Sequence, residues 1–369
     1  MLIGAAAGLG GAIRSRAWGD VPLPSFSRNP RLVPVAQADR VWNGVATTAD
    51  GRIFVSFPSC DRPGVQVAEI LPGDVIWPFP DAAWNAVRAD HDPRGAFVLV
   101  NAVRIGPDGH LWVIDAGAPG IGRPAVPGGA RLFVFDLARN QLVRTYDLSA
   151  GIRPRSYIDD IRFNGSHLYA TDAGRAGLLV VNLASGQVRR VLDGHPLLTA
   201  RRDMFADGRR LLNDQGEPLR VDGDQLEVTP DGRWLLAQPC SGPMVRIPTV
   251  LLDDPSTAPA TLAQALHVWL DTPTTGGTAI DARGALYLSD TNRRRILRIG
   301  QDRRIEPLVA DSRLVWSDAM WLDRTGWLWI PATQQNLTHG FQGGRQSVQY
   351  PVWLFKIHVG VGPPSNDHA

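Results

Sequence analysis

One short pattern recurs six times along this 369-residue chain, and it limits the folds that the chain can adopt. In each copy, a run of alternating apolar residues leads into a turn that contains glycine, and a second alternating run follows. Alternation on both sides of a tight turn is typical of a β-hairpin. The copies begin at Asn43, Asn101, Asp159, Asp224, Gly276 and Asp318. These starts lie 58, 58, 65, 52 and 42 residues apart, near the roughly 40–50 residues that a four-stranded propeller blade and its loops occupy.

Six such hairpins predict an all-β fold, a six-bladed β-propeller. The last blade is one strand short, whereas the run RLVPVAQ at 31–37 has no partner ahead of the first blade. Because an open sheet edge is a liability and Pro34 suits an outermost strand, we expect the N-terminal strand to complete the last blade. The predicted organisation is one propeller domain at 29–360. Residues 1–28 are then an export-signal remnant or a disordered tail, and residues 361–369 a disordered C-terminal tail.

Composition narrows the partners of the chain. A formal net charge of +2 implies neither nucleic acid nor an anionic membrane as a partner. No apolar run approaches the roughly 20 residues of a membrane helix. The opening MLIGAAAGLGGA is similar to the apolar part of an export signal, although no basic residue precedes it. We therefore expect a secreted or periplasmic monomer whose partner is a small molecule. If the opening residues are not an export signal, they form an N-terminal tail.

The two cysteines follow the second strands of the first and fourth predicted blades. Those blades face each other across a six-bladed ring, and a disulfide needs Cα atoms within about 7 Å. The sequence therefore predicts that Cys60 and Cys240 are separate thiols.

The first residues of the six hairpins form a column that should surround the central channel. First strands are innermost in a propeller, so five oxygen-bearing side chains converge there: Asn43, Asn101, Asp159, Asp224 and Asp318. Such a ring can accept a polar ligand, or a hard cation such as Ca²⁺, which takes six to eight oxygens. The alternative is that Asn and Asp at strand entries satisfy backbone groups of turns.

Three further features carry weaker signals. Asp115, Asp172 and Asp290 end second strands, where a structural role at the following turn is favoured. Of the adjacent Asp159 and Asp160, we expect one in the channel and the other in the blade interior. The long link at 193–221 predicts a loop with a small hairpin on one face, and its His195 is a candidate ligand-binding residue or a turn residue.

Several motifs together resemble the major royal jelly protein/yellow family, in its bacterial branch. They include NGVATTADGRIFVSFP, WPFPDAAWN, LWVIDAG, YIDDIR, LYATDAG, VLDGHP, LEVTPDGRWLLAQPCSGPMVRIPTVLL and GGRQSVQYPVWLFKI. The similarity runs from about Leu32 to Val359. It implies a six-bladed propeller, commonly secreted, that binds aromatic amines in its channel in some members. Insect members are linked to dopachrome isomerisation, and the family has no agreed catalytic set.

More distantly, the channel column resembles that of the gluconolactonase/senescence-marker propellers, which hold a divalent metal with a Glu, an Asn and an Asp. Here Asn43 stands near the position of the Glu, Asp159 replaces the Asn, and Gly276 replaces the Asp. Compensation by Asp318 or Asp224 is a hypothesis. The implied metal set is Asn43, Asp159 and Asp318.

The leading hypothesis is an exported propeller that binds a small aromatic or cyclic molecule in its channel, with dopachrome-like tautomerisation as its activity. A metal-dependent lactonase is the alternative, and a non-catalytic scaffold is the third. No cofactor follows from the residues with certainty, and Ca²⁺ or another divalent metal is a hypothesis. The residues predicted to bind the ligand are Asn43, Asn101, Asp159, Asp224, Asp318 and His195. The catalytic residues stay unknown.

Overall fold

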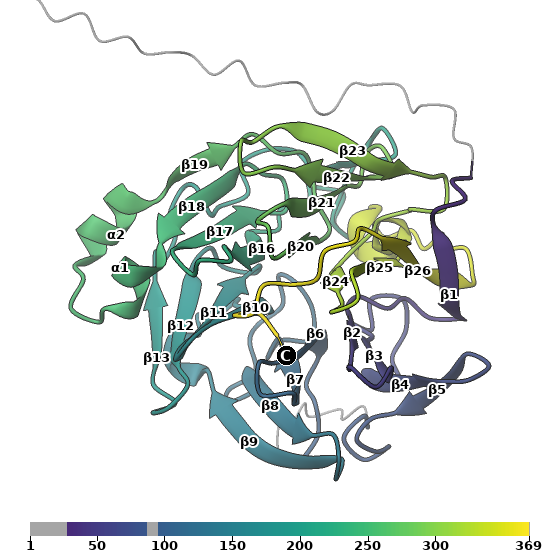
Figure 1. Ribbon diagram of the computed structural model, residues 1–369, viewed down its shortest axis with the longest axis horizontal. Helices are drawn as coiled ribbons and strands as arrows, with labels where there is room; N and C mark the ends of the chain where they lie inside the picture. Colours follow the sequence, from purple (N-terminus) through teal and green to yellow (C-terminus); the bar gives the residue numbers. More distant parts are fainter. Residues whose placement is uncertain (1–27, 87–94, 369) are drawn as a thin grey trace, which may run out of the picture.

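The computed structural model describes residues 28–86 and 95–368. Six four-stranded antiparallel sheets stand around a central axis like the blades of a propeller, as Figure 1 shows. The first strand of each blade is the innermost one. The apolar residues on the two faces of a blade pack against the two neighbouring blades. The predicted all-β, six-bladed fold is confirmed.

The first three blades follow one another along the chain and contain four consecutive strands each. Blade 1 consists of β2 (Val45–Thr47), β3 (Ile53–Ser56), β4 (Val67–Leu71) and β5 (Val75–Pro78). Blade 2 consists of β6 (Val100–Ile105), β7 (Leu111–Asp115), β8 (Arg131–Asp136) and β9 (Gln141–Asp147). Blade 3 consists of β10 (Ile158–Asn164), β11 (His167–Asp172), β12 (Leu178–Asn182) and β13 (Val188–Val191).

Blades 4 and 5 repeat this order, and the sixth blade draws on both ends of the described chain. Blade 4 consists of β16 (Gly223–Val228), β17 (Trp234–Pro239), β18 (Met244–Pro248) and β19 (His267–Leu270). Blade 5 consists of β20 (Thr278–Ile280), β21 (Leu286–Asp290), β22 (Arg295–Ile299) and β23 (Ile305–Ala310). Blade 6 consists of β24 (Trp321–Leu322), β25 (Trp327–Ala332), β26 (Val352–His358) and β1 (Val33–Ala38).

The ring closes through the N-terminal strand, as the sequence predicted. β1 pairs with β26 in antiparallel register from Val33↔Lys356 to Ala38↔Val352, with an irregularity between Pro34 and Ala36. Proline has no amide hydrogen, so it is tolerated at this outer edge. The predicted export signal falls within residues 1–27, outside the described part of the chain, and it stays a prediction.

The C-terminal segment differs from the disordered tail that we expected. After β26 the chain runs across the middle of the ring (Figure 1). There His368 is buried, its ring stacks on Trp321 with centroids 3.8 Å apart, and its Nε2 donates to the Leu322 carbonyl oxygen at 2.7 Å. The sequence of this segment has no alternating pattern that would predict its order. Its order comes from contacts with the completed ring. It closes one end of the channel.

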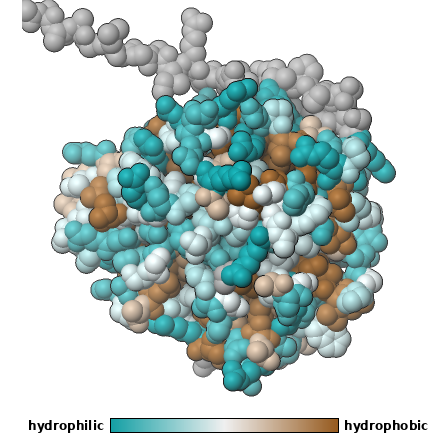
Figure 2. All heavy atoms as spheres, in the orientation of Figure 1, coloured by the Kyte–Doolittle hydropathy of each residue, from teal (hydrophilic) through white to brown (hydrophobic). Residues whose placement is uncertain are grey.

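The hydrophobic core lies between adjacent blades. Between blades 1 and 2, for example, Phe79 meets Phe54 and Phe135 edge-to-face, with ring centroids 5.1 and 5.4 Å apart. Aromatic pairs prefer this geometry. On the face in Figure 2, hydrophilic and hydrophobic side chains are interspersed. Within the described residues no helix is long and apolar enough to cross a membrane.

The long link between blades 3 and 4 contains the predicted small hairpin, formed by β14 (Phe205–Ala206) and β15 (Arg209–Arg210). Its Met204, Leu211 and Val221 belong to one buried apolar cluster with Trp316 and Phe341. This cluster covers the end of the channel opposite the C-terminal segment. Within the described residues, short helices lie in the links: η1 (Ser149–Gly151), α1 (Thr249–Asp253), α2 (Pro259–Ala265), η2 (Gln335–Leu337) and η3 (His339–Phe341).

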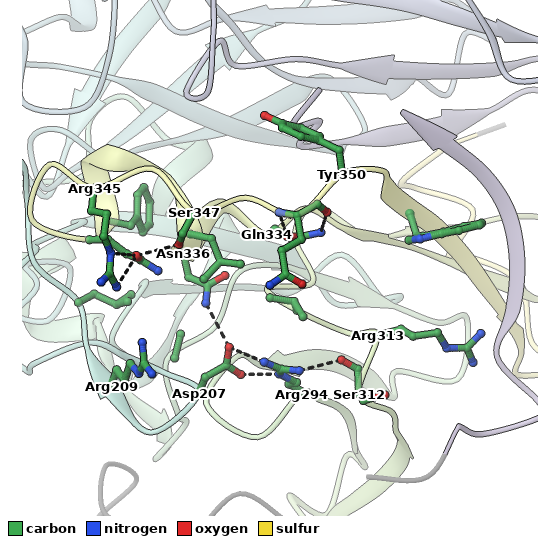
Figure 3. A pocket seen from close by; sticks show the side chains of 18 of the residues that line it. Asp207, Arg209, Arg294, Ser312, Arg313, Gln334, Asn336, Arg345, Ser347 and Tyr350 are labelled. Atoms are coloured by element: carbon green, nitrogen blue, oxygen red, sulfur yellow. Dashed lines mark hydrogen bonds and ion pairs between the residues drawn. The ribbon is translucent and has the colours of Figure 1, made fainter. Parts of the chain in front are cut away.

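A large surface cleft lies beside this cover, between the β14–β15 hairpin and the loops of blades 5 and 6 (Figure 3). Its volume is about 950 Å³. Five arginines line it, and we call it the arginine cleft: Arg209, Arg210, Arg294, Arg313 and Arg345.

Candidate functional site

All six residues of the predicted column line one small cavity on the channel axis. These are Asn43, Asn101, Asp159, Asp224, Gly276 and Asp318. The covering loops add six more residues: Ile121, Val221, Cys240, Trp316, Gln335 and Phe341. The cavity measures about 20 Å³, which is room for one water molecule or one ion of similar size. The covering side chains narrow the access to it, and Asp159 stays partly accessible while Asn101, Asp224 and Asp318 are buried.

Bulges in three inner strands place the column residues of blades 2, 3 and 4. The register shifts between Val100 and Ala102 in β6, so Asn101 is an extra residue in its strand. Equivalent shifts surround Asp159 and Asp160 in β10, and Asp224 and Gln225 in β16. A bulge lets a strand re-aim one side chain away from the regular pleat. In this way three neighbouring blades turn a polar group into the cavity.

The two asparagines order the site through hydrogen bonds. Asn43 Nδ2 donates to the Asn101 carbonyl oxygen at 2.9 Å. Asn101 Nδ2 donates to both the carbonyl oxygen and Oδ1 of Asp159, each at 2.9 Å. The Tyr157 hydroxyl donates to Asn101 Oδ1 at 2.9 Å. These contacts fix the orientation of the Asn101 amide, which in turn presents a donor to Asp159.

The carboxyl groups of Asp159 and Asp224 line the same cavity from adjacent blades and influence each other's ionisation. Burial raises the pKa of Asp159 to about 7, although the hydrogen bond with Asp224 acts in the opposite direction. Burial and the neighbouring Asp159 carboxyl raise the pKa of Asp224 well above its usual value. Each carboxyl group disfavours ionisation of its neighbour, so the two together retain a proton to a higher pH than an isolated carboxyl group does. Gln225 Nε2 donates a hydrogen bond to Asp224 Oδ2 at 2.7 Å.

Asp318, the third buried carboxyl group, faces the same cavity from blade 6. Its Oδ2 accepts a hydrogen bond from Trp316 Nε1 at 2.7 Å, and its Oδ1 accepts one from the Ala319 amide at 2.9 Å. Burial and the charge of Asp159 raise its pKa well above the usual value. Three acidic groups therefore concentrate at one point, and protons or a cation must offset their charge.

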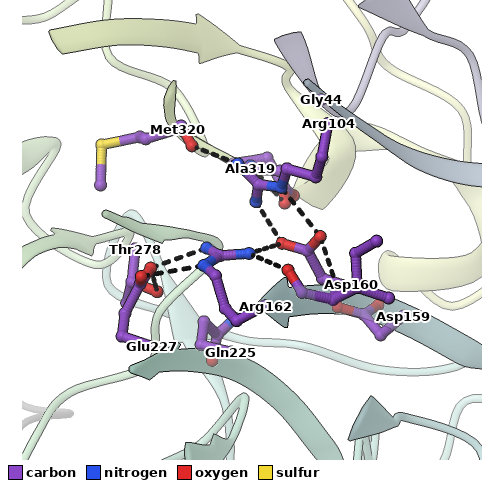
Figure 4. Close-up of polar contacts among 12 residues, drawn as sticks. Gly44, Arg104, Asp159, Asp160, Arg162, Gln225, Glu227, Thr278, Ala319 and Met320 are labelled. Carbon is purple, nitrogen blue, oxygen red and sulfur yellow. Dashed lines mark hydrogen bonds and ion pairs between the residues drawn. The ribbon is translucent and has the colours of Figure 1, made fainter. Parts of the chain in front are cut away.

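A second polar layer lies between the cavity and the C-terminal segment, since Arg162 Nε lies 3.9 Å from Asp367 Oδ1. Figure 4 shows the side chains of this layer. Arg162 forms a bidentate ion pair with Glu227, at 2.9 and 2.7 Å, and its Nη1 lies 2.8 Å from Asp160 Oδ2. Arg104 Nε donates to Asp160 Oδ1 at 2.9 Å, and its Nη1 donates to the Met320 carbonyl oxygen. Burial alone would raise the pKa of Asp160, but the two guanidinium groups hold it well below its usual range.

The adjacent Asp159 and Asp160 point to different places, as we expected for this pair. Asp159 lines the cavity, whereas Asp160 turns to the arginines below. Sequence reasoning missed the network, although a signal existed. Each charged residue stands three positions after a column residue and has an apolar residue on either side of it in the strand: Arg104, Arg162 and Glu227. In such a strand only the channel can accept a charge.

The candidate site residues outside the column do not line the channel cavity. His195 does not line the cavity. It lies on a separate surface cleft, where its Nδ1 accepts a hydrogen bond from the Leu197 amide at 3.2 Å, as a turn residue does. Asp115 accepts from the amides of Val98, Leu99 and Gly117, which is the structural role favoured for its column. Cys60 and Cys240 are both free thiols, as predicted.

The cover of the cavity contains functional candidates that the sequence did not single out. Trp316 and Phe341 meet edge-to-face with ring centroids 5.3 Å apart, and both line the cavity. The buried Oε1 of Gln335, also in the lining, has no hydrogen-bond partner among the described residues. Their positions depend on links of irregular length, which carry no repeating pattern.

The donor set fits a metal ion poorly as it stands. Within residues 28–86 and 95–368, no three His, Cys, Asp or Glu side chains are grouped as metal ligands. A Cβ at Gly276 would lie 2.4 Å from the Ser317 carbonyl oxygen, so the backbone of blade 6 occupies the place of a side chain there. The set Asn43, Asp159 and Asp318 stays a prediction, and no chemical step is derived through a metal.

Comparison with solved structures places the fold. A luciferin-regenerating enzyme superposes with a TM-score of 0.57 and 10% identity, over 92% of this chain and 98% of that one. A gluconolactonase from Xanthomonas campestris gives a TM-score of 0.53 and 12% identity, over 92% of this chain and 96% of that one. At these identities the likeness shows the propeller fold alone.

Comparison of sequences gives the family. Protein yellow of Drosophila pseudoobscura pseudoobscura is 29% identical over 120 residues, which is 30% of this chain and 21% of that protein. The match thus spans about a fifth of the length of this relative. The family model described as major royal jelly protein matches residues 99–353, more than half of the chain and most of the ring. The chain belongs to the major royal jelly protein family.

Proposed function

We propose that this protein is a proton-transfer isomerase, a tautomerase, that acts on a small cyclic or aromatic molecule at the capped end of its channel. The observation that carries the proposal is that the carboxyl groups of Asp159 and Asp224 line one small cavity and that both have a raised pKa. Isomerisation by proton transfer needs a base and an acid close together, with the base poised near the working pH. The two carboxyl groups differ in this respect, because the pKa of Asp159 is about 7 and that of Asp224 lies well above its usual value.

The chemistry follows from these protonation states. The Asp159 carboxylate takes a proton from a carbon next to a carbonyl or imine group of the substrate, so a C–H bond breaks and an O–H bond forms. The Asp224 carboxylic acid gives its proton to the substrate at the other end of the conjugated system. The substrate keeps its atoms and its charge, and the pair has exchanged its proton. Passage of the proton from Asp159 to Asp224, directly or through water, then resets the pair for the next substrate.

Access requires a change in the cover. The cavity of about 20 Å³ holds no ring, so the substrate ring must occupy the place of Trp316 and Phe341 while its reacting carbon reaches Asp159. These aromatic side chains support the proposal because a flat apolar ring can replace or stack on them. The family membership supports a ligand in the channel, and export of the protein is part of the same proposal.

The experiment compares native protein with the variants Asp159→Asn and Asp224→Asn. Dopachrome and its decarboxylated analogue serve as substrates, and loss of colour in excess of the spontaneous rate is measured from pH 5.5 to 8.5. We expect kcat/KM to rise with pH through about 7, where Asp159 ionises, and to fall by at least about 100-fold in either variant, the typical contribution of an acid or base. The surface variant Asp231→Asn should leave the rate unchanged. Rates equal to the spontaneous reaction in native protein would refute the proposal.

A lactonase is the second candidate, because five oxygen-bearing side chains converge on the cavity. Hydrolysis of D-glucono-1,5-lactone, followed by acid release with and without added Ca²⁺ or Zn²⁺, distinguishes the two. Metal-dependent acid release that is lost in Asp318→Asn favours the lactonase. Absence of both activities leaves the scaffold as the function that fits.

A further inference from the structure

The arginine cleft is a second site, separate from the carboxyl pair. Among its lining residues five arginines face one acidic residue, Asp207. Arg294 holds that aspartate in a bidentate pair at 2.6 and 2.9 Å and also donates to the Ser312 carbonyl oxygen. Arg210 is paired with Asp203, and Arg313 with Asp311. Three of the arginines are therefore anchored to carboxylates of the protein.

The other two arginines are differently placed. Arg209 and Arg345 are both exposed, and among the described residues neither has a carboxylate within ion-pair distance. Arg345 is held in place by Gln342 Oε1, which accepts from Nε and Nη2 at 3.2 and 3.1 Å. In Figure 3 the two guanidinium groups lie on the same side of the cleft. A guanidinium offers a planar fork of donors that matches a carboxylate, and an anion between two such forks gains from both.

The floor of the cleft offers an acceptor that lacks a donor. Asn336 is almost fully buried, its Nδ2 points to Asp207 Oδ2 at 3.5 Å, and its Oδ1 has no hydrogen-bond partner within the described residues. A buried polar atom without a partner destabilises the fold unless water or a ligand supplies a hydrogen. A ligand that carries hydroxyl groups supplies that hydrogen.

The rim of the cleft presents exposed aromatic side chains. Tyr350 and Trp353 are 41% and 36% exposed, although large aromatic residues are usually buried. An exposed aromatic face packs well against a ring with an apolar side and polar edges. The volume of about 950 Å³ exceeds what a single ring fills.

We propose that the arginine cleft binds an acidic carbohydrate, a short chain of sugar rings that carry carboxylates. Its carboxylates lie at Arg209 and Arg345, a hydroxyl donates to Asn336 Oδ1, and its rings pack on Tyr350 and Trp353. This site is independent of the proposed isomerase activity, because none of these five side chains lines the channel cavity. Phe341 alone among the aromatic residues lines both spaces.

The test is titration calorimetry of the full chain with trigalacturonic acid. Maltotriose, of equal length and without charge, and sodium sulfate, an anion without a sugar, are titrated in parallel. We expect trigalacturonic acid to bind, more weakly at higher salt because screening weakens the ion pairs, and the other two to bind at least tenfold more weakly. The double variant Arg209→Gln/Arg345→Gln should lose at least about tenfold in affinity, because each arginine supplies a charge-assisted contact.

Control variants separate binding from folding. Arg139→Gln removes an exposed arginine from blade 2, away from the cleft, and should retain full affinity. Asn336→Leu should weaken binding several-fold, and its melting temperature is measured in parallel because the substitution removes both the unpartnered oxygen and the 3.5 Å contact of Nδ2 with Asp207. Equal affinity of the double variant and native protein would overturn the proposal. So would maltotriose binding as tightly as trigalacturonic acid, sulfate binding as tightly, or no binding of trigalacturonic acid at all.

Discussion

The carboxyl pair in the channel makes the stability of this protein depend on pH in a predictable direction. The pKa of Asp159 rises from 3.8 in a solvated chain to about 7 in the fold, mainly because the group is buried. A raised folded-state pKa means that the folded protein holds a proton that the unfolded chain releases. Its contribution to stability is therefore fully present below pH 3.8 and is lost as the pH rises toward 7.

The magnitude follows from the width of that interval. Each pKa unit corresponds to about 1.36 kcal/mol, so the span from 3.8 to about 7 amounts to about 4 kcal/mol. Asp159→Asn removes the titration and keeps the shape. An asparagine at this position can accept from Asn101 Nδ2 and donate to Asp224. We expect the variant to gain stability relative to native protein as the pH rises, by about 4 kcal/mol in total between pH 4 and pH 7.5.

The assay is urea unfolding of both proteins at half-unit steps from pH 4 to pH 7.5, with the difference in the free energy of unfolding plotted against pH. Titrating groups away from the channel are shared and cancel in this difference, whereas Asp224 and Asp318 lose the neighbouring charge that raises their pKa in the native protein. The control Asp231→Asn alters an exposed carboxylate whose pKa is lowered mainly by its hydrogen bond with Thr229, so its difference should change little and in the opposite direction. A flat difference for Asp159→Asn, or one that falls with pH, would refute the reasoning.

Three other outcomes are expected. Arg162→Met leaves Glu227 buried without a guanidinium and Asp160 with that of Arg104 alone, so urea unfolding should show a loss of about 3–5 kcal/mol, and the double variant Arg162→Met/Glu227→Met should lose less; a larger loss in the double variant contradicts this. A chain that begins at Arg40 lacks β1 and exposes the edge of β26, so calorimetry should show a clearly lower melting temperature and light scattering should show aggregation; an unchanged melting temperature would mean that β1 does not close the ring. Thiol titration of the unfolded, unreduced protein should find Cys60 and Cys240 both reactive, and a titre near zero would mean that they are bonded.

The sequence by itself determined the ring and the place of its polar column. Alternation with a period of two and turns that contain glycine are local properties, so each hairpin is readable without its neighbours. Since the repeats are equivalent, residues at the same position of each copy must lie at the same radius. For this reason the sequence alone places Asn43, Asn101 and Asp159 at the channel, where they line the cavity. The unpaired N-terminal strand and the missing last strand likewise determined the closure.

The tertiary structure alone decided the chemistry of that column. The sequence grouped Asp159 with Asn43 and Asp318 as an implied metal set, whereas in the fold the Asp159 carboxyl interacts with Asp224 of the adjacent blade. Three β-bulges aim these side chains, and no residue pattern announces a bulge. The cover over the cavity and the C-terminal segment below it come from links without periodicity. A pKa depends on how much water is excluded and which charges are near, and both are set by segments far apart in the chain.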